Sequence, residues 1–324
     1  MRPGFLRFLG WDTFLSVLCL ALIAYALVAV PNFPTEFNIS QAIAGVSERA
    51  LIVLPMTLLV IAREIDLSVA SILSLSSVVF GVVVRDSGSM SLALGAALAT
   101  GGLCGAFNGL LITRLALPSL VVTLGTLAMF RGIGYILLGP ASVNLFPDAF
   151  TDFGIDTVGG GVLPETILPF LVLAPCFFLL LQRSATGRRI YAIGGNPDTA
   201  LYSGVRIDRI RFGLFVASGL VCGLAGIVFT ARVANARADN ALGLELDVIT
   251  IVLLGGIHVF GGRGRLSGVL WALLLIALVR NVLGLQQIGG DAQAMTIGLL
   301  LIGTLLLGNA GQWLAGRWKG RRAA

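Results

Sequence analysis

Long apolar segments alternate with short polar segments along the whole chain. A helix needs about 20 mostly apolar residues to cross the hydrocarbon core of a bilayer. Ten segments approach or meet this requirement, and they cover residues 13–30, 43–62, 67–84, 92–113, 119–138, 166–182, 212–232, 247–260, 266–285 and 294–311. The pattern predicts an all-α fold, a polytopic transmembrane helical bundle of about ten spans that forms one domain over residues 1–324.

Two of these segments are irregular. Segment 43–62 contains Glu48 and Arg49, and segment 247–260 is short and leads into glycine-rich sequence. Non-helical backbone at membrane depth survives only against protein or a water-filled cavity, because its polar groups need partners. Both segments are therefore candidates for broken or re-entrant helices.

Composition supports a membrane protein and excludes several other classes. The 324 residues are 57% hydrophobic and 12% charged, whereas soluble domains carry about 25% charged residues. So few charges cannot cover a water-facing surface of this size. A soluble enzyme, a nucleic-acid-binding protein and a disordered protein are excluded, and the predicted surroundings are a lipid bilayer.

The basic residues predict the orientation of the bundle. Cytoplasmic loops of membrane proteins carry an excess of Lys and Arg. With ten spans and both termini in the cytoplasm, 16 of the 22 Lys and Arg residues fall on the cytoplasmic side. The loop over residues 139–166 then lies on the opposite side, and it contains acidic residues but no Lys or Arg.

Glycines at four-residue spacing predict close helix packing. Gly101, Gly105 and Gly109 follow this spacing in one span, and Gly219 and Gly223 repeat it in another. Such small-residue faces let two helix backbones approach each other.

No group of residues points to a metal or catalytic centre. The cysteines, Cys19, Cys104, Cys176 and Cys222, lie inside apolar segments, where a free thiol packs like a small hydrophobe. The only histidine, His258, has no second ligand nearby in sequence. We expect no metal site and no enzymatic activity in this chain.

The longest predicted cytoplasmic segment, residues 187–211, is too polar to cross a membrane. Asn196 is a suitable cap for a short helix that begins with Pro197 and carries Asp198 in its first turn. Gly204 is a suitable terminator, and between them stands the apolar group Ala200, Leu201 and Tyr202. The segment is either a solvated loop containing a helix or a docking element for a cytoplasmic partner.

Five stretches, in order along the chain, resemble one protein family. They are IDLSVAS (65–71), GAFNGLLIT (105–113), PSLVVTLGTLAMFRG (118–132), GRRIYAIGGNPDTALYSGVRIDRIR (187–211) and ELDVITIVLLGGIHVFGGRG (245–264). The family comprises the permease subunits of bacterial ABC importers for ribose, xylose, arabinose, rhamnose and autoinducer-2, within the branched-chain amino acid permease superfamily. Each stretch alone is a weak match, but five at compatible spacing are specific.

The resemblance implies partners and a location in the bacterial inner membrane. In this family an ATP-binding subunit docks on the cytoplasmic face, a periplasmic binding protein delivers the sugar, and a second permease subunit, identical or related, completes the pathway. The chain has no G-x-x-x-x-G-K-S/T phosphate loop, and its only lysine is Lys319. It therefore needs no cofactor of its own, and ATP is expected on the partner subunit. The positions that match the family's coupling loop are Gly187, Arg188, Gly194, Asn196, Pro197 and Gly204.

Polar residues inside the spans are candidates for the translocation pathway. Polar side chains within a membrane usually face the bundle interior or a cavity, and neutral amides and hydroxyls suit the hydroxyl groups of a sugar. The candidates are Asn108, Thr123, Thr126, Asn281 and Gln286. The alternative for each is a hydrogen bond between helices. For Arg131 and Arg280 we expect ion pairing or packing.

Three positions depart from the family pattern. Arg63 and Glu64 stand where the commonest pattern has two glycines, and Ala70 replaces a third. Together with residues 236–250, this segment is more similar to the rhamnose and autoinducer-2 branches than to the ribose branch. The sequence identifies neither the sugar nor whether the permease pairs with itself.

A second function remains open. Carboxylates next to a span could serve a proton-coupled secondary sugar transporter, and Glu64 and Asp66 are the candidates here. The alternative is structural, with a local salt bridge for Glu64 and a helix cap for Asp66.

Overall fold

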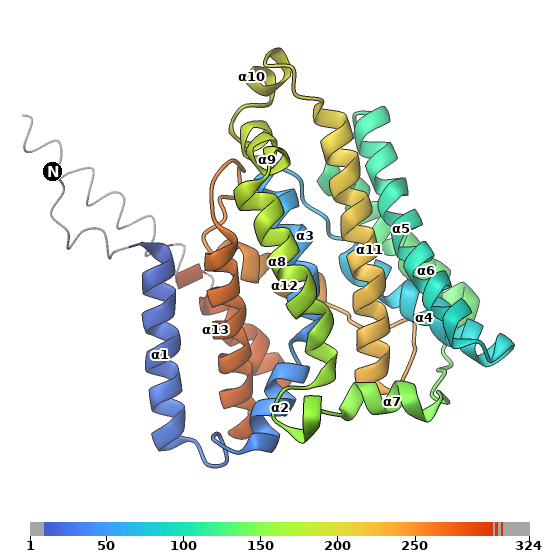
Figure 1. The fold of residues 1–324 in the computed structure, drawn as a ribbon, viewed down its shortest axis with the longest axis vertical. Helices are drawn as coiled ribbons and strands as arrows, with labels where there is room; N and C mark the ends of the chain where they lie inside the picture. Colours follow the sequence, from blue (N-terminus) through green and yellow to red (C-terminus); the bar gives the residue numbers. More distant parts are fainter. Residues whose placement is uncertain (1–9, 301, 304–305, 307–324) are drawn as a thin grey trace, which may run out of the picture.

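The computed structural model describes residues 10–300, 302, 303 and 306, and every regular element in that part of the chain is helical (Figure 1). This confirms the predicted all-α fold. The elements are α1 (Trp11–Ala29), α2 (Glu36–Ala44), α3 (Ser47–Ile61), α4 (Val69–Ser87), α5 (Met90–Arg114), α6 (Ser119–Leu138), α7 (Asp148–Ile155), η2 (Val158–Gly160), η3 (Glu165–Ile167), α8 (Leu168–Arg183), α9 (Ala185–Gly195), α10 (Pro197–Tyr202), α11 (Ile207–Val233), α12 (Leu244–Leu254) and α13 (Leu266–Leu285).

The number of membrane-spanning helices is close to the prediction. In the described part of the chain, seven helices are long and apolar enough to cross a membrane, namely α1, α4, α5, α6, η3 with α8, α11 and α13. The bent pair α2 and α3 adds an eighth. The predicted span 294–311 extends beyond the described residues, although its first part belongs to helical backbone over residues 290–300.

Both irregular segments are broken in the structure. The axes of α2 and α3 differ by 41° across Gly45 and Val46. The second irregular segment contains α12, which has 11 residues and is therefore about 16 Å long, too short to cross a bilayer. A turn with four glycines at positive φ follows it, at Gly256, Gly261, Gly262 and Gly264. This turn leads the chain into α13.

The core of the bundle surrounds α3. Every residue of α3 except Arg49 is buried, so neighbouring helices cover it on all sides. The close packing predicted at the glycines is also confirmed, and the structure shows that α5 and α11 pack on each other. A Cβ atom placed on Gly105 would collide with the backbone carbonyl of Phe215, and one placed on Gly219 would collide with that of Gly101. Glycine is required here because the two backbones are in contact.

The two polar connections lie at opposite ends of the bundle. Helices α9 and α10 project from the upper end in Figure 1, whereas α7, from the 139–166 loop, lies across the lower end. This placement agrees with their predicted separation on the two sides of a membrane.

Candidate functional site

Two short helices form the segment at the upper end. The Ser184 hydroxyl accepts a hydrogen bond from the Gly187 N–H at 3.0 Å and caps α9. Asn196 caps α10 in the same way, with its Oδ1 accepting from the Thr199 N–H at 3.0 Å. Gly204 follows with a φ of +79°. The predicted cap at Asn196 is confirmed, whereas α9 was not predicted; the Ser184 cap was its signal in the sequence.

This segment is anchored to the core by a compact junction. Cβ atoms on Gly187 or Gly194 would collide with the carbonyls of Leu181 and Ile61 respectively. Arg63 donates from Nε to the Gly194 carbonyl at 2.7 Å and from Nη2 to the Gly195 carbonyl at 2.9 Å. The C-terminal end of α9 is therefore tied directly to the residues that follow α3.

The glycine-rich turn after α12 completes the junction. The Gly262 N–H donates to the carbonyl of Ile61 at 2.8 Å. A Cβ on Gly262 would lie 2.8 Å from the carbonyl oxygen of Gly194. Three segments that are distant in sequence therefore meet in backbone contact at the C-terminal end of α9. They are the end of α3, the end of α9 itself and the glycine-rich turn after α12.

The two carboxylates that suggested proton transport are both held by neighbours. Glu64 lies 2.7 Å from the Arg211 guanidinium at the start of α11. Burial raises the pKa of Glu64, and the Arg211 charge opposes that rise. Asp66 is fully buried and accepts from the Ser68 hydroxyl at 2.6 Å and the Ser218 hydroxyl at 3.1 Å. Glu64 is thus held in an ion pair, and Asp66 is held by hydrogen bonds in the protein interior.

The outer face of α9 and α10 is exposed in the part of the chain that the structure describes. Arg188 and Arg189 are exposed on α9. Leu201 and Tyr202 on α10 are 59% and 90% exposed, while Ala200 is buried. An exposed aromatic residue beside an exposed leucine and two arginines has the character of a protein-binding face.

Two of the predicted pathway residues bond to the segment between α3 and α4, and a third bonds within its own helix. Asn108 donates from Nδ2 to the Ser68 hydroxyl at 2.8 Å. The Thr123 hydroxyl is within bonding distance of the carbonyls of Ile65 and Ser119, and that of Thr126 donates to Thr123 at 3.4 Å. All three side chains are buried. Asn108 and Thr123 contact the segment between α3 and α4 through Ser68 and Ile65.

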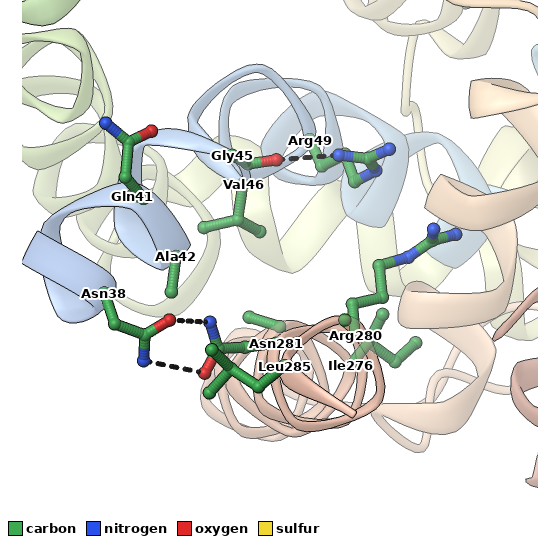
Figure 2. Close-up of a pocket in the computed structure, with 12 residues that line it drawn as sticks. Asn38, Gln41, Ala42, Gly45, Val46, Arg49, Ile276, Arg280, Asn281 and Leu285 are labelled. Atoms are coloured by element: carbon green, nitrogen blue, oxygen red, sulfur yellow. Dashed lines mark hydrogen bonds between the residues drawn. The ribbon is translucent and has the colours of Figure 1, made fainter. Parts of the chain in front are cut away.

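The other two predicted pathway residues lie at the far end of α13. Asn281 and Asn38 form a reciprocal amide pair, with Nδ2 to Oδ1 distances of 2.7 and 3.1 Å (Figure 2). Gln286 is exposed directly after the last residue of α13. The structure therefore gives Asn281 and Gln286 other surroundings than those of Asn108 and Thr123.

Asn281 lines a polar cavity of about 310 Å³ between α2, α3 and α13. Its other polar lining residues are Asn38, Gln41, Arg49 and Arg280. Asn38, Gln41 and Arg49 were not among the pathway residues predicted from the sequence. Asn38 and Gln41 precede the predicted second span, so nothing in the apolar pattern marked them.

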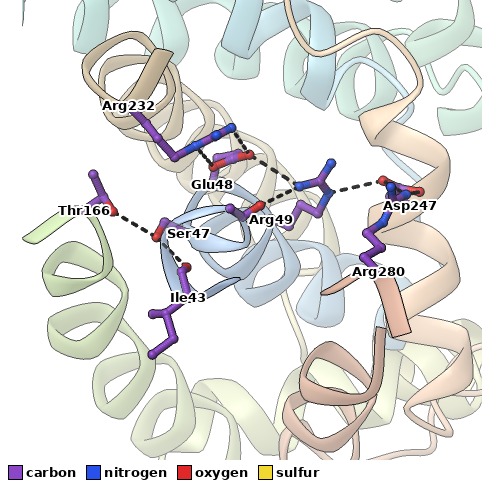
Figure 3. Close-up of polar contacts among 9 residues, drawn as sticks. Ile43, Ser47, Glu48, Arg49, Thr166, Arg232, Asp247 and Arg280 are labelled. Atoms are coloured by element: carbon purple, nitrogen blue, oxygen red, sulfur yellow. Dashed lines mark hydrogen bonds and ion pairs between the residues drawn. The ribbon is translucent and has the colours of Figure 1, made fainter. Parts of the chain in front are cut away.

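An ion network borders this cavity (Figure 3). The buried Glu48 lies 2.9 Å from Arg232 and 3.4 Å from Arg49. Asp247 on α12 lies 3.1 Å from Arg49 and 2.7 Å from Arg280. The expected pairing of Arg280 is confirmed. The other arginine considered from sequence, Arg131, donates to the carbonyls of Ala238 and Asn240 at 2.9 and 2.8 Å.

Within residues 10–300, no group of three or more His, Cys, Asp or Glu side chains is arranged to hold a metal ion. His258 is exposed in the glycine-rich turn. Cys19, Cys104 and Cys222 are buried, and Cys176 is exposed on α8.

The chain is similar to known membrane permeases. Residues 38–307 match the family model described as branched-chain amino acid transport system / permease component. The L-arabinose ABC transporter permease protein AraH of Azospirillum brasilense is 33% identical over 87% of this chain and 83% of its own length. The autoinducer 2 import system permease protein LsrD of Escherichia coli O157:H7 is 30% identical over 90% of each chain. No solved structure matches the chain.

Proposed function

This chain belongs to the branched-chain amino acid transport system / permease component family, and from that membership we propose that it is the permease subunit of an ATP-driven sugar importer. Its apolar helices make it a multi-pass protein of the bacterial inner membrane. In this assignment the chain itself is not an enzyme and only provides the path across the bilayer. Both termini are in the cytoplasm, which is the orientation that the arginine distribution favours.

The substrate of this importer is a monosaccharide or a small molecule of similar polarity. Relatives in two organisms carry the names of L-arabinose and autoinducer-2 transport systems. The stretches 63–71 and 236–250 favour a rhamnose-like or autoinducer-2-like substrate within this class. Asn38, Gln41 and Asn281 supply neutral amides that can exchange hydrogen bonds with hydroxyl groups.

The observation that carries the proposal is the junction of α9 with the core. A separate ATP-binding subunit docks on Leu201, Tyr202 and Arg188 and moves α9 and α10. Because Gly194 and Gly262 are in backbone contact with the end of α3, that movement reaches the most buried helix of the bundle.

Two further partners follow from the same assignment. A periplasmic binding protein docks at the end formed by α7 and the rest of the 139–166 loop. A second permease, identical or related, pairs with this one in the bilayer.

The test is purification of the tagged chain in mild detergent, identification of the proteins that accompany it, and an ATPase assay. Recovery of a phosphate-loop ATPase whose activity rises when the sugar-loaded binding protein is added is the expected result. The composition of the complex also distinguishes a homodimer from a heterodimer.

The competing function, a proton-coupled secondary transporter, predicts a different result. In that case the chain alone, reconstituted in vesicles, accumulates sugar when a proton gradient is imposed, and Glu64→Gln or Asp66→Asn abolishes the uptake. Uptake of this kind would overturn the assignment to an ATP-driven importer.

A further inference from the structure

A further cavity, of about 530 Å³, lies where α5 ends and where α6 and α11 begin. Residues 63–65 form part of its wall; they belong to the segment 62–68 between α3 and α4, called the linker below. Because α11 follows α10 directly along the chain, this linker cavity is at the end of the bundle that carries α9 and α10. Its volume is within the range of about 300–1,000 Å³ that small-molecule sites have.

The charged side chains that line the linker cavity balance one another. They are two arginines and two carboxylates, namely Arg63, Arg211, Glu64 and Asp208. Glu64 and Arg211 are paired at 2.7 Å, but a carboxylate has about four lone-pair sites and a guanidinium has five donors, so both retain bonding capacity. An ion finds no excess of opposite charge here, whereas a sugar hydroxyl donates to one kind of group and accepts from the other. The lining therefore suits a neutral polyhydroxyl molecule.

Polar residues continue from the cavity toward the interior of the bundle. Asn108 lies one turn before the lining residue Ile112 in α5, and Thr123 lies one turn after the lining residue Ser119 in α6. Positions four apart lie on the same face of a helix. Both Asn108 and Thr123 are buried, and the Oδ1 of Asn108 has no hydrogen-bond partner among the described residues. Since an unpaired buried acceptor is costly, a passing hydroxyl group gains a bond there.

Consecutive residues of the linker contact different helices. Arg63 bonds to the end of α9, and Glu64 pairs with the start of α11. The Ile65 N–H donates to the Ser119 hydroxyl at the start of α6 at 3.3 Å. The Ser68 hydroxyl accepts a hydrogen bond from α5 at 2.8 Å. Because Arg63, Glu64 and Ile65 also line the cavity, a displacement of α9 is transmitted to the wall of the cavity.

From these observations we infer that the linker cavity is the cytoplasmic exit site of the transported sugar, and that the linker changes its width when α9 moves. The inference rests on the proposed function, because it takes the sugar as the cargo and α9 as the element that the ATP-binding subunit displaces. Hydroxyl groups of the sugar bond to Glu64, Asp208 and Arg211 before release. The hydrogen bonds between the linker and α5 close the inner end of the site in the described conformation.

The first experiment compares two tryptophan variants of α5 in the reconstituted complex. Thr113→Trp fills part of the cavity, and Leu103→Trp places the same side chain at a 71% exposed position outside it. Uptake per ATP hydrolysed is measured with L-arabinose, L-rhamnose or autoinducer-2, according to which of them stimulates the ATPase when loaded on the binding protein. Thr113→Trp is expected to lower this ratio at least about tenfold, and Leu103→Trp to leave it unchanged.

The second experiment follows the cavity directly and does not depend on the tryptophan variant. In a complex with Cys176→Ala, which removes the exposed native thiol, the rate at which Thr113→Cys reacts with a maleimide is measured without nucleotide and after trapping with vanadate. The two rates are expected to differ, whereas those of Leu115→Cys, 61% exposed and outside the cavity, are expected to be equal. Adding Arg63→Ala is expected to remove the difference at Thr113→Cys, because it breaks both bonds to α9.

The results separate this inference from the proposed function. Wild-type uptake per ATP hydrolysed in Thr113→Trp, or equal reaction rates of Thr113→Cys in the two states, would overturn the inference and place the exit elsewhere. The proposed function stands in that case, since the ATPase of the wild-type complex still responds to the loaded binding protein. A wild-type complex whose ATPase responds to none of the three loaded sugars would contradict the proposed function, and the inference would fail with it.

Discussion

Arg63 has a backbone φ of +66°, a conformation that costs an ordinary residue about 1–2 kcal/mol. Glycine would adopt it without cost, and the resembled family has glycine here. The arginine side chain offsets this cost by donating two hydrogen bonds to the carbonyls of Gly194 and Gly195 at the C-terminal end of α9. A cation is also favoured at the negative end of a helix dipole. A feature that looked like a departure in the sequence is therefore part of the junction.

Two substitutions separate the side-chain contribution of Arg63 from its backbone strain. Arg63→Ala keeps the strain and removes both hydrogen bonds, so it is expected to destabilise the protein by about 1–2 kcal/mol. Arg63→Gly removes the strain as well and is expected to recover about half of that loss. Thermal unfolding of the purified protein measures both, with Arg114→Ala at the exposed end of α5 as the control. Equal stability of Arg63→Ala and the control would contradict this role.

At the scale of helices, the sequence predicted contacts best where glycine spacing implied them. Close packing was predicted for the two spans that form α5 and α11, because small residues four apart form a flat strip on one helix face; that these two helices pack on each other is a finding of the structure. The break between α2 and α3 was expected from Glu48 and Arg49, since ionised side chains do not lie in the hydrocarbon core without partners. Helix α9 was missed because its sequence is polar and only its Ser184 cap marks it.

The glycine interface can be tested within a single helix. Gly105→Ala places a Cβ against the carbonyl of Phe215, and Gly95→Ala places one in open space. Overpacking of this kind costs about 1–3 kcal/mol, so Gly105→Ala is expected to lower the midpoint of thermal unfolding clearly. Gly95→Ala, also in α5, is expected to leave it unchanged. Similar midpoints for the two variants would show that α5 and α11 do not pack as described.

The coupling function of α9 and α10 is tested at Gly204 and Arg188. Gly204→Val forces a β-branched residue to a φ of +79° and is expected to displace α10, whereas Gly204→Asn tolerates that conformation. Arg188→Glu reverses an exposed charge on the docking face. In the reconstituted complex, Gly204→Val and Arg188→Glu are expected to lower sugar uptake per ATP hydrolysed at least about tenfold, with normal membrane insertion. Wild-type coupling in both would exclude this face as the docking site.

At the scale of the whole molecule, the polar cavity could not have been found from the sequence. Its residues come from α2, α3 and α13, and Asn38 and Asn281 are paired across 243 positions. An apolar pattern identifies which segments lie in the membrane, but it does not determine which of them become neighbours. Gln286 illustrates the same limit, because it follows a long apolar segment and yet lies exposed beyond the end of α13.

The docking sites proposed for the ATP-binding subunit and for the periplasmic binding protein both depend on the orientation of the bundle in the membrane. This orientation can be measured directly. Thr157 lies in the 139–166 loop and Asp198 in α10, at the opposite end (Figure 1). In a chain with Cys176→Ala, which removes the exposed native thiol, Thr157→Cys is expected to react with a membrane-impermeant maleimide added to spheroplasts. Asp198→Cys is expected to react only after the membrane is opened, because cytoplasmic loops are those rich in arginine. The reverse pattern would place α9 and α10 outside the cell, where no ATP-binding subunit could reach them.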